Sequence, residues 1–259
     1  MPQHYLCLQK SDLTGESQYV QCTAHEDICP ARQAGQDIVY KVDTSYAFYL
    51  DNWLESMDMM CWAQNAISLP YVFYFVFFGL GGVLSYPFMD SIGRRTTNWV
   101  FTTINLVAQT VATFVPSYSL RLVMFAIMGL TCAKNSLCYT WLFEYVEKRH
   151  RSAASASVNF LDLFTCFICG AYFIWVSRNV QPLLEMYLYV GIAAHLFLCF
   201  FVPESPKWLL MQGRADDAIK SINYVARFNF KKTRFDSDIQ FTDFDHVKIE
   251  TNSRTINKD

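Results

Sequence analysis

A long apolar stretch that ends in a doubly basic turn constrains this chain more than any other feature. Leu69–Met89 is almost entirely apolar, and Asp90-Ser91-Ile92-Gly93-Arg94-Arg95 follows it directly before a second apolar run begins. About 20 apolar residues match the roughly 30 Å core of a bilayer, and such a span must be helical because hydrocarbon offers no hydrogen bonds. The stretch therefore predicts a membrane hairpin whose basic turn faces the inside.

The composition supports a membrane protein. Charged residues make up 17% of the chain, whereas an average soluble domain has about 25%. Hydrophobic residues make up 53% and come in blocks, which is typical of the membrane class. The net charge of −2 gives no reason to expect nucleic acid as a partner. No nucleophile–base set, phosphate loop or metal-ligand spacing stands out, so we expect no enzyme and no cofactor, while bound lipids are compatible with this composition.

The N-terminal part is expected to lie on the external side. Residues 1–44 are polar, and we expect loop-like structure there and no cleavable signal peptide. Cys22 and Cys29 could pair if this tail faces an oxidising compartment; separate thiols are the alternative. Residues 45–67 form an interfacial segment, because the mixture of aromatic and acidic residues in Tyr46–Trp62 favours a helix lying at the membrane surface.

Further apolar runs complete a bundle at residues 68–204. After Leu69–Met89 the expected spans are Thr97–Val115, Leu122–Phe143, Ala153–Val176 and Leu183–Val202. Basic residues gather in the loops on one side of these spans, namely Arg94, Arg95, Lys148, Arg149, Arg151, Lys207 and Arg214. The short loops on the other side carry only Arg121 and Arg178. The positive-inside rule therefore places the N-terminus outside and the C-terminus inside.

Two short amphipathic helices are expected on the internal side, within residues 205–228. Ser205 is a favourable cap for the first helix, and Gly213 can end it. Ala215–Phe228 predicts the second helix, because its apolar residues recur at helical spacing. Residues 229–259 form a polar tail.

Four segments of this pattern resemble signatures of one transporter superfamily. Asp90–Arg95 resembles its signature between helices 2 and 3, and Glu144–Arg151 resembles the signature that ends helix 4. Pro203–Leu210 is similar to the segment that ends helix 6, and Asn52–Cys61 resembles the end of the external loop before helix 2. In this order and spacing, the segments resemble the organic-cation/organic-anion branch of the major facilitator superfamily, over roughly residues 50–228.

The resemblance implies an all-α membrane protein. Its five transmembrane helices would correspond to helices 2–6 of the superfamily's N-terminal bundle, followed by the short amphipathic helices. Helix 1 and the C-terminal half have no counterpart in this sequence. Tyr86 and Lys134 stand where the family has glycine, and Ser91 and Phe125 stand where it has arginine.

The resemblance also implies a set of gating-loop and signature residues: Asp90, Gly93, Arg94, Arg95, Glu144, Arg149, Arg151, Glu204 and Lys207. In the family, the charged loop between helices 2 and 3 latches neighbouring helices in one state; the alternative is a topology anchor and a helix cap. Glu204 either joins Lys207 and Arg214 in a charge relay or only caps the helix that follows it.

Three ionisable residues lie inside the expected spans, where a charge costs roughly 3 kcal/mol or more. Lys134 either binds an anion in a central cavity or forms a structural pair with Asp162. His195 either relays protons or hydrogen-bonds a neighbouring helix.

Cys166 and Cys169 lie on one helical face, either as a redox motif or as small apolar packing residues.

Two functions are consistent with the sequence. The first is a truncated, non-transporting subunit of a larger assembly, for example in the mitochondrial inner membrane, surrounded by other membrane protein subunits and lipids. The second is a half-unit that carries a small organic ion by alternating access with a partner, in the plasma membrane. The missing half favours the first function. The aromatic residues of Leu69–Met89, with Gly79, Gly81 and Gly82, predict a face that partner subunits or lipids cover.

Overall fold

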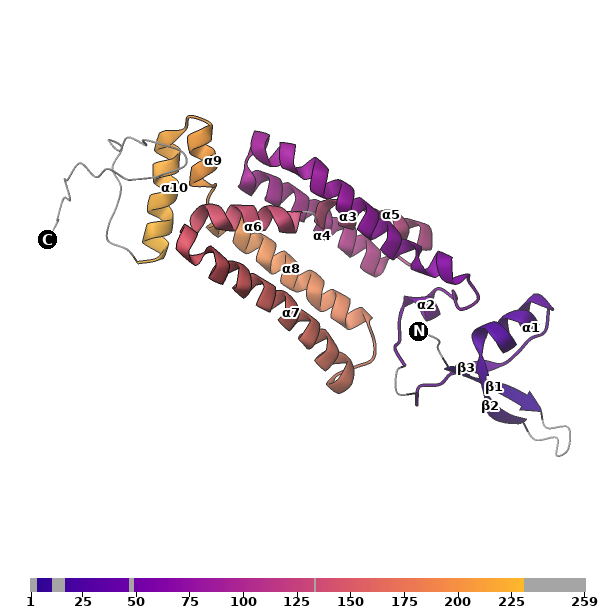
Figure 1. Cartoon of the computed structure of the whole chain (residues 1–259). Helices are drawn as coiled ribbons and strands as arrows, with labels where there is room; N and C mark the ends of the chain where they lie inside the picture. The colour runs from indigo at the N-terminus through magenta and orange to yellow at the C-terminus, as the bar shows by residue number, and fades with distance from the viewer. Residues whose placement is uncertain (1–3, 11–16, 47–48, 133, 231–259) are drawn as a thin grey trace.

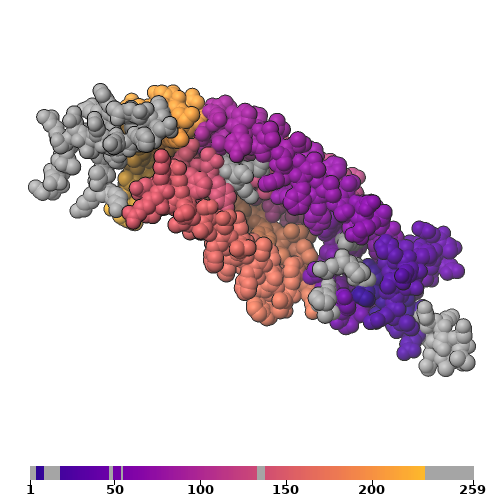
Figure 2. Space-filling view, in the orientation of Figure 1, coloured from indigo at the N-terminus to yellow at the C-terminus, as the bar shows by residue number. Residues whose placement is uncertain are grey.

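The computed structural model describes residues 4–10, 17–46, 49–132 and 134–230. The molecule is elongated and mostly helical (Figure 1). A small N-terminal domain lies at one end of a helical bundle, and two short helices lie across the other end, with the same outline in the space-filling view of Figure 2.

An antiparallel sheet of three strands begins the chain, where the sequence analysis expected loops. β1 (His4–Lys10) lies between β2 (Ser17–Thr23) and β3 (Tyr40–Val42). Alternate β1 residues Tyr5 and Cys7 point to one face and are buried in a small core. The expectation of irregular structure in residues 1–44 is wrong, because a core this small leaves only a weak apolar pattern.

Two disulfides stabilise this domain. Cys7 pairs with Cys22, and Cys29 pairs with Cys61, with Cα atoms 5.9 and 5.5 Å apart. The pairing of Cys22 with Cys29 therefore does not form. The first bridge joins β1 to β2; the second ties α1 (Cys29–Gln33), which follows the π-helical turn Ala24–Ile28, to the segment that enters the bundle. Cross-links of this kind compensate for a small hydrophobic core.

The described residues between the sheet and the bundle form mostly turns and irregular backbone. Among these described residues only α2 (Trp53–Ser56) is helical, so the expectation of a continuous interfacial helix over Tyr46–Trp62 is wrong. The backbone of this segment pairs instead with the loop around residues 178–180. The Asp51 N–H donates to the Arg178 carbonyl oxygen, and the Val180 N–H donates to the Asp51 carbonyl oxygen, both at 3.0 Å.

The bundle consists of α3 (Gln64–Ile92), α4 (Arg94–Phe114), α5 (Tyr118–Cys132), α6 (Lys134–Tyr145), α7 (Arg151–Trp175) and α8 (Gln181–Phe201), with the 3-10 turn Lys148–His150 before α7. Within the described residues, three helical stretches are long and apolar enough to cross a membrane, and α5 is a shorter apolar helix. Those three are Gln64–Ile92, Lys148–Trp175 and Gln181–Phe201. The expected third span, Leu122–Phe143, falls on α5 and α6, which lie on either side of residue 133, outside the described residues.

Glycines allow α3 and α5 to pack with their backbones in contact. A Cβ atom added to Gly81 of α3 would lie 2.1 Å from the Leu130 carbonyl oxygen of α5. Reciprocally, a Cβ atom on Gly129 of α5 would lie 2.2 Å from the Tyr74 carbonyl oxygen of α3. Small residues at such crossings are typical of membrane helix pairs.

The two short helices follow the sequence prediction. α9 (Pro206–Met211) begins at Ser205, whose Oγ accepts a hydrogen bond from the Trp208 N–H at 3.3 Å. Proline at the first position suits this start, because its missing N–H would have no partner in the helix. Gly213, at φ +71°, separates α9 from α10 (Ala215–Phe228).

Candidate functional site

The candidate site is built around the turn between α3 and α4. Gly93 has φ +102°, a conformation that side chains with a Cβ rarely adopt. A Cβ atom there would also lie 2.6 Å from Glu204 Oε2 and 3.3 Å from the Trp208 ring. The turn can approach the α8–α9 linker this closely only because residue 93 is glycine.

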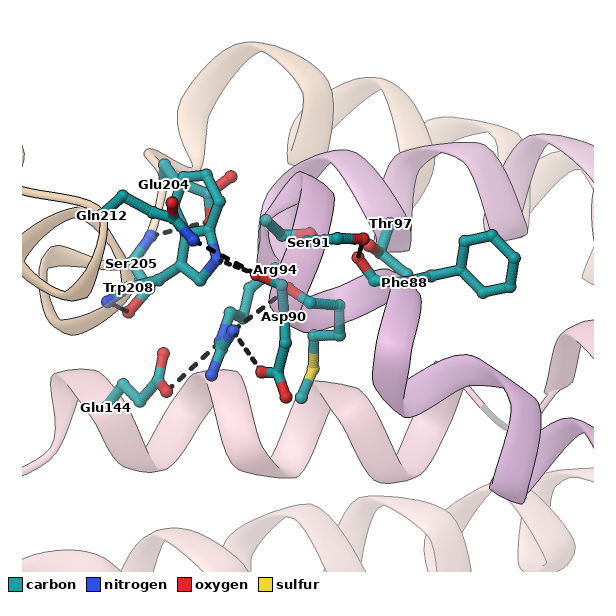
Figure 3. A network of polar contacts seen from close by, with 12 residues as sticks. Phe88, Asp90, Ser91, Arg94, Thr97, Glu144, Glu204, Ser205, Trp208 and Gln212 are labelled. Atoms are coloured by element: carbon teal, nitrogen blue, oxygen red, sulfur yellow. Dashed lines mark hydrogen bonds and ion pairs between the residues drawn. The ribbon is translucent and has the colours of Figure 1, made fainter.

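Arg94 is the buried centre of the site (Figure 3). Its Nη1 donates to Asp90 Oδ1 at 2.9 Å and to the Met89 carbonyl oxygen at 3.1 Å, and its Nε donates to Glu144 Oε1 at 3.4 Å. The Arg94 and Glu144 side chains are 7% and 8% exposed, whereas Asp90 is 65% exposed. Arg94 thus joins the α3–α4 turn to α6 through a buried ion pair with Glu144. Its second ion pair, with Asp90, lies at the solvent-exposed surface.

The ion pair between Arg94 and Glu144 is incompletely satisfied. Its distance of 3.4 Å is long for a charge-assisted hydrogen bond. Glu144 Oε2 is buried and has no hydrogen-bond partner among the residues that the structure describes. Because a buried polar atom without a partner costs free energy, this contact is less favourable than a fully hydrogen-bonded ion pair.

Glu204 caps α4 from a position far along the chain. Its Oε1 accepts hydrogen bonds from the backbone N–H groups of Arg95 and Ser205, both at 3.0 Å. A carboxylate at a helix N-terminus satisfies a free N–H and favours the helix dipole. The Arg95 side chain reaches the Cys199 carbonyl oxygen near the end of α8 and so ties α4 to that helix.

α9 closes over the turn through its polar groups. The Trp208 indole N–H donates to the Asp90 carbonyl oxygen at 2.9 Å, and the Gln212 side-chain amide donates to the same oxygen at 3.4 Å. That carbonyl is close to the end of α3, where helix carbonyls lack partners within their own helix. The sequence analysis missed both donors.

α6 and α10 contact the linker from two other directions. The Tyr145 hydroxyl lies 2.9 and 3.0 Å from the carbonyl oxygens of Pro203 and Glu204, and the Ser221 hydroxyl donates to that of Glu204 at 2.7 Å. Nothing local to Ser221 in the sequence marks this contact. We call the following set the latch network: Asp90, Gly93, Arg94, Arg95, Glu144, Tyr145, Glu204, Trp208, Gln212 and Ser221.

The other signature residues lie outside the latch network. The Arg149 and Lys207 side chains are exposed, and Arg151 donates to the Val146 carbonyl oxygen at 3.3 Å. Arg214 bonds to Asp217 at 2.7 Å. Glu204 therefore caps α4 through backbone N–H groups, a role that neither sequence alternative described.

Within the bundle, His195 links α8 to α4. Its Nε2 lies 3.0 Å from the Thr103 hydroxyl, and its ring stacks beside Trp99. Cys169 of α7 lies 2.8 Å from the Tyr187 hydroxyl of α8, whereas Cys166 is exposed. These contacts join helices through polar atoms along the bundle.

Asp162 is exposed on α7. One turn earlier on α7, Asn159 accepts a hydrogen bond from the Tyr139 hydroxyl of α6 at 2.9 Å. The side chain of Lys134 lies outside the described part of the structure, so its pairing with Asp162 stays a prediction.

The glycines of α3 serve two different surfaces. Gly81 packs against α5 of the same chain, whereas a Cβ atom on Gly79 or Gly82 would meet nothing within 4 Å. The aromatic residues Phe75 and Phe88 on α3 are exposed. Coverage of this face by partners or lipids stays a prediction.

Comparisons with known proteins point to membrane carriers. Residues 38–242 match the family model for "Sugar (and other) transporter". The Organic cation transporter protein of Drosophila melanogaster is 26% identical over 198 residues, which cover 73% of this chain and 35% of that protein. Organic anion transporter 3 of Sus scrofa is 27% identical, covering 70% and 33%. The Beta-alanine transporter of Drosophila melanogaster is 28% identical, covering 71% and 30%. The chain thus spans about a third of the length of these relatives.

Proposed function

The chain belongs to the sugar (and other) transporter family, and from that premise we propose that it moves small organic ions across the plasma membrane by alternating access. The family is one of transporters rather than enzymes. The long apolar helices of this chain make it an integral membrane protein. The relatives are named as transporters of an organic cation, of an organic anion and of β-alanine. We therefore propose small organic ions as the substrate class.

The latch network is the observation that carries this proposal. Alternating access requires one end of the bundle to open and close while the helices stay intact. The network joins the α3–α4 turn, α6, α9 and α10 through Arg94 and Glu204. Because one Glu144 oxygen has no partner among the described residues and Asp90 meets solvent, we infer that the network can break and re-form. Such a device suits a gate better than a fixed anchor.

We place the N-terminal domain outside the cell and the latch network inside. Two disulfides support the first placement, since such bridges persist in oxidising compartments. The basic residues around the latch network, such as Arg149 and Arg214, support the second. This orientation requires that all five helical spans expected from the sequence cross the membrane.

The orientation has a direct test. Intact cells that express the chain are treated with a membrane-impermeant reductant and then with an impermeant maleimide. We expect the four disulfide-bonded cysteines, Cys7, Cys22, Cys29 and Cys61, to be labelled only after reduction from outside. A cysteine placed at Arg227 should stay unlabelled until the cells are permeabilised. Labelling of both sites from outside refutes the orientation.

Asp162 is the proposed contact for a cationic substrate. It lies 11 residues into α7, about 17 Å along the helix and so near the middle of a bilayer. A carboxylate at that depth is a functional candidate because it is costly in hydrocarbon. Its exposure on α7 leaves it available to a water-filled path.

Uptake by the purified full chain in vesicles tests the function. We expect saturable uptake of tetraethylammonium that Asp162→Asn reduces at least tenfold, since an isosteric amide removes only the charge, while Cys166→Ser, on the same helix, leaves uptake unchanged. If the folded chain shows no saturable uptake of either a quaternary ammonium or an aromatic carboxylate, the proposal fails. A non-transporting subunit, in a mitochondrial or other assembly, would then take its place; the relatives give that function no support.

A further inference from the structure

A pocket between the first turn of α4 and α10 borders the latch network and shares four of its residues, namely Arg95, Glu204, Trp208 and Ser221. Its volume is about 440 Å³, within the roughly 300–1,000 Å³ of typical ligand sites. The lining combines basic, hydroxyl and apolar side chains: Arg95 and Thr96 from α4, Arg214, Lys220 and Tyr224 from the α10 region, and Ile92, Pro203 and Trp208 around them.

The charges in this pocket favour an anion. Three basic side chains line it, namely Arg95, Arg214 and Lys220, against two carboxylates. Glu204 is already engaged by two backbone N–H groups. Asp217 bonds to Arg214 at 2.7 Å and to Lys220 at 3.1 Å, and these two cations hold the pKa of the Asp217 carboxyl below its usual range. Three positive and two negative charges leave the lining with a net charge of +1. Arg95 contributes to it from α4, where its Nη2 also donates to the Cys199 carbonyl oxygen.

The pocket lies at the level where the spanning helices end. Ile92 is the last residue of α3, and Pro203 follows α8 by two residues. α10 lies across this end of the bundle (Figure 1), and its residues Tyr224 and Phe228 are exposed one turn apart. An amphipathic helix with exposed aromatic and basic residues is typical of the membrane interface.

We propose that this pocket binds the phosphate ester of an anionic lipid headgroup from the inner leaflet. Arg95 and Lys220 would contact the phosphate oxygens, because charged nitrogens bind them strongly. Tyr224 and Phe228 would rest against the lipid beside them. The inner-leaflet source rests on the inward orientation proposed above, and a free phosphate ester is the other source of the same chemistry.

The test measures binding rather than transport, so its failure leaves the transport proposal standing. The purified full chain is placed in phosphatidylcholine nanodiscs with and without phosphatidylinositol 4-phosphate, and the retained lipid is measured by native mass spectrometry. Soluble inositol bisphosphate and inorganic phosphate are added as competitors. Lys220→Gln is the main variant because this exposed residue can change without unfolding the chain. Arg227→Gln is the matched control: it removes one exposed charge from the same helix, outside the pocket.

We expect selective retention of the phosphoinositide, weakened tenfold or more by Lys220→Gln through loss of a charge-assisted hydrogen bond. Arg227→Gln should weaken it no more than about fivefold, the effect of one charge near an anionic surface. If the two variants lose phosphoinositide binding equally, or if the chain retains the phosphoinositide no better than phosphatidylcholine, the proposed lipid site in this pocket is overturned. If soluble inositol bisphosphate binds as tightly as the lipid, the phosphate site stands and the membrane source is overturned.

Discussion

Replacing Gly81 by alanine tests the contact between α3 and α5 that holds the bundle together. The new Cβ atom would lie 2.1 Å from the Leu130 carbonyl oxygen, whereas ordinary contacts begin at 3.4 Å. The obstructing atom belongs to the backbone and cannot rotate away, so the helices would have to move apart by more than 1 Å. Overpacking of this kind costs about 1–3 kcal/mol.

Gly82→Ala is the matched control, because it makes the same change one residue away where nothing lies within 4 Å. Alanine is the better helix former by roughly 1 kcal/mol, so the control should be neutral or stabilising. The higher helix propensity of alanine also offsets part of the cost of the clash in Gly81→Ala. The two variants should therefore differ in stability by about 1–3 kcal/mol, or several degrees in Tm, at roughly 2–4 °C per kcal/mol for a chain of this size.

The assay is thermal unfolding of the detergent-purified chain, followed by tryptophan fluorescence and by loss of the monodisperse peak in size-exclusion chromatography. Gly129→Ala, the reciprocal change on α5, should lower Tm by a similar amount. If Gly81→Ala melts at the same temperature as Gly82→Ala, the close crossing of α3 and α5 is refuted.

Three further predictions concern the latch network and the N-terminal domain. Gly93→Ala should lower stability by about 1 kcal/mol more than Gly213→Ala in the same melting assay, because alanine is strained at the positive φ of both positions but only at residue 93 must it also displace the Glu204 carboxylate. Glu144→Gln should destabilise the chain by about 3 kcal/mol, because it removes the buried one of the two carboxylates that Arg94 contacts and leaves only the exposed Asp90. A double change with Arg94→Gln should cost less than the sum of the single changes; a larger cost would disprove the pairing. Burial raises the pKa of Glu55, so its protonated form is favoured in the folded domain, and its contribution to stability is present below the ordinary glutamate pKa and lost as pH rises through the raised value. Melting curves from acidic to neutral pH should show that loss in the native chain but not in Glu55→Gln, and identical pH profiles would contradict it.

Signals carried by neighbouring residues were sufficient for α3 and α9. The apolar length of Leu69–Met89 predicts a spanning helix, and α3 contains that range with a few extra residues at each end. Ser205 and the following proline predict the start of α9, because a cap and its helix are adjacent in the chain. The family resemblance likewise rested on short motifs such as Asp90–Arg95, whose residue types can be read without knowing what they contact.

Contacts between distant segments were decided only by the tertiary structure. Glu204 caps a helix that begins 110 positions earlier, and no local pattern distinguishes that role from capping its own neighbour. Cys22 has several partners compatible with its spacing. The strand register puts Cys22 opposite Tyr5, on the same face of the sheet as Cys7, and the disulfide joins the two cysteines diagonally. Gly81 is used by α5 whereas Gly82 is open, because one helical step of about 100° turns the Cα from a neighbouring helix toward empty space. The sequence specifies such residues by type, but only packing determines which surface each one faces.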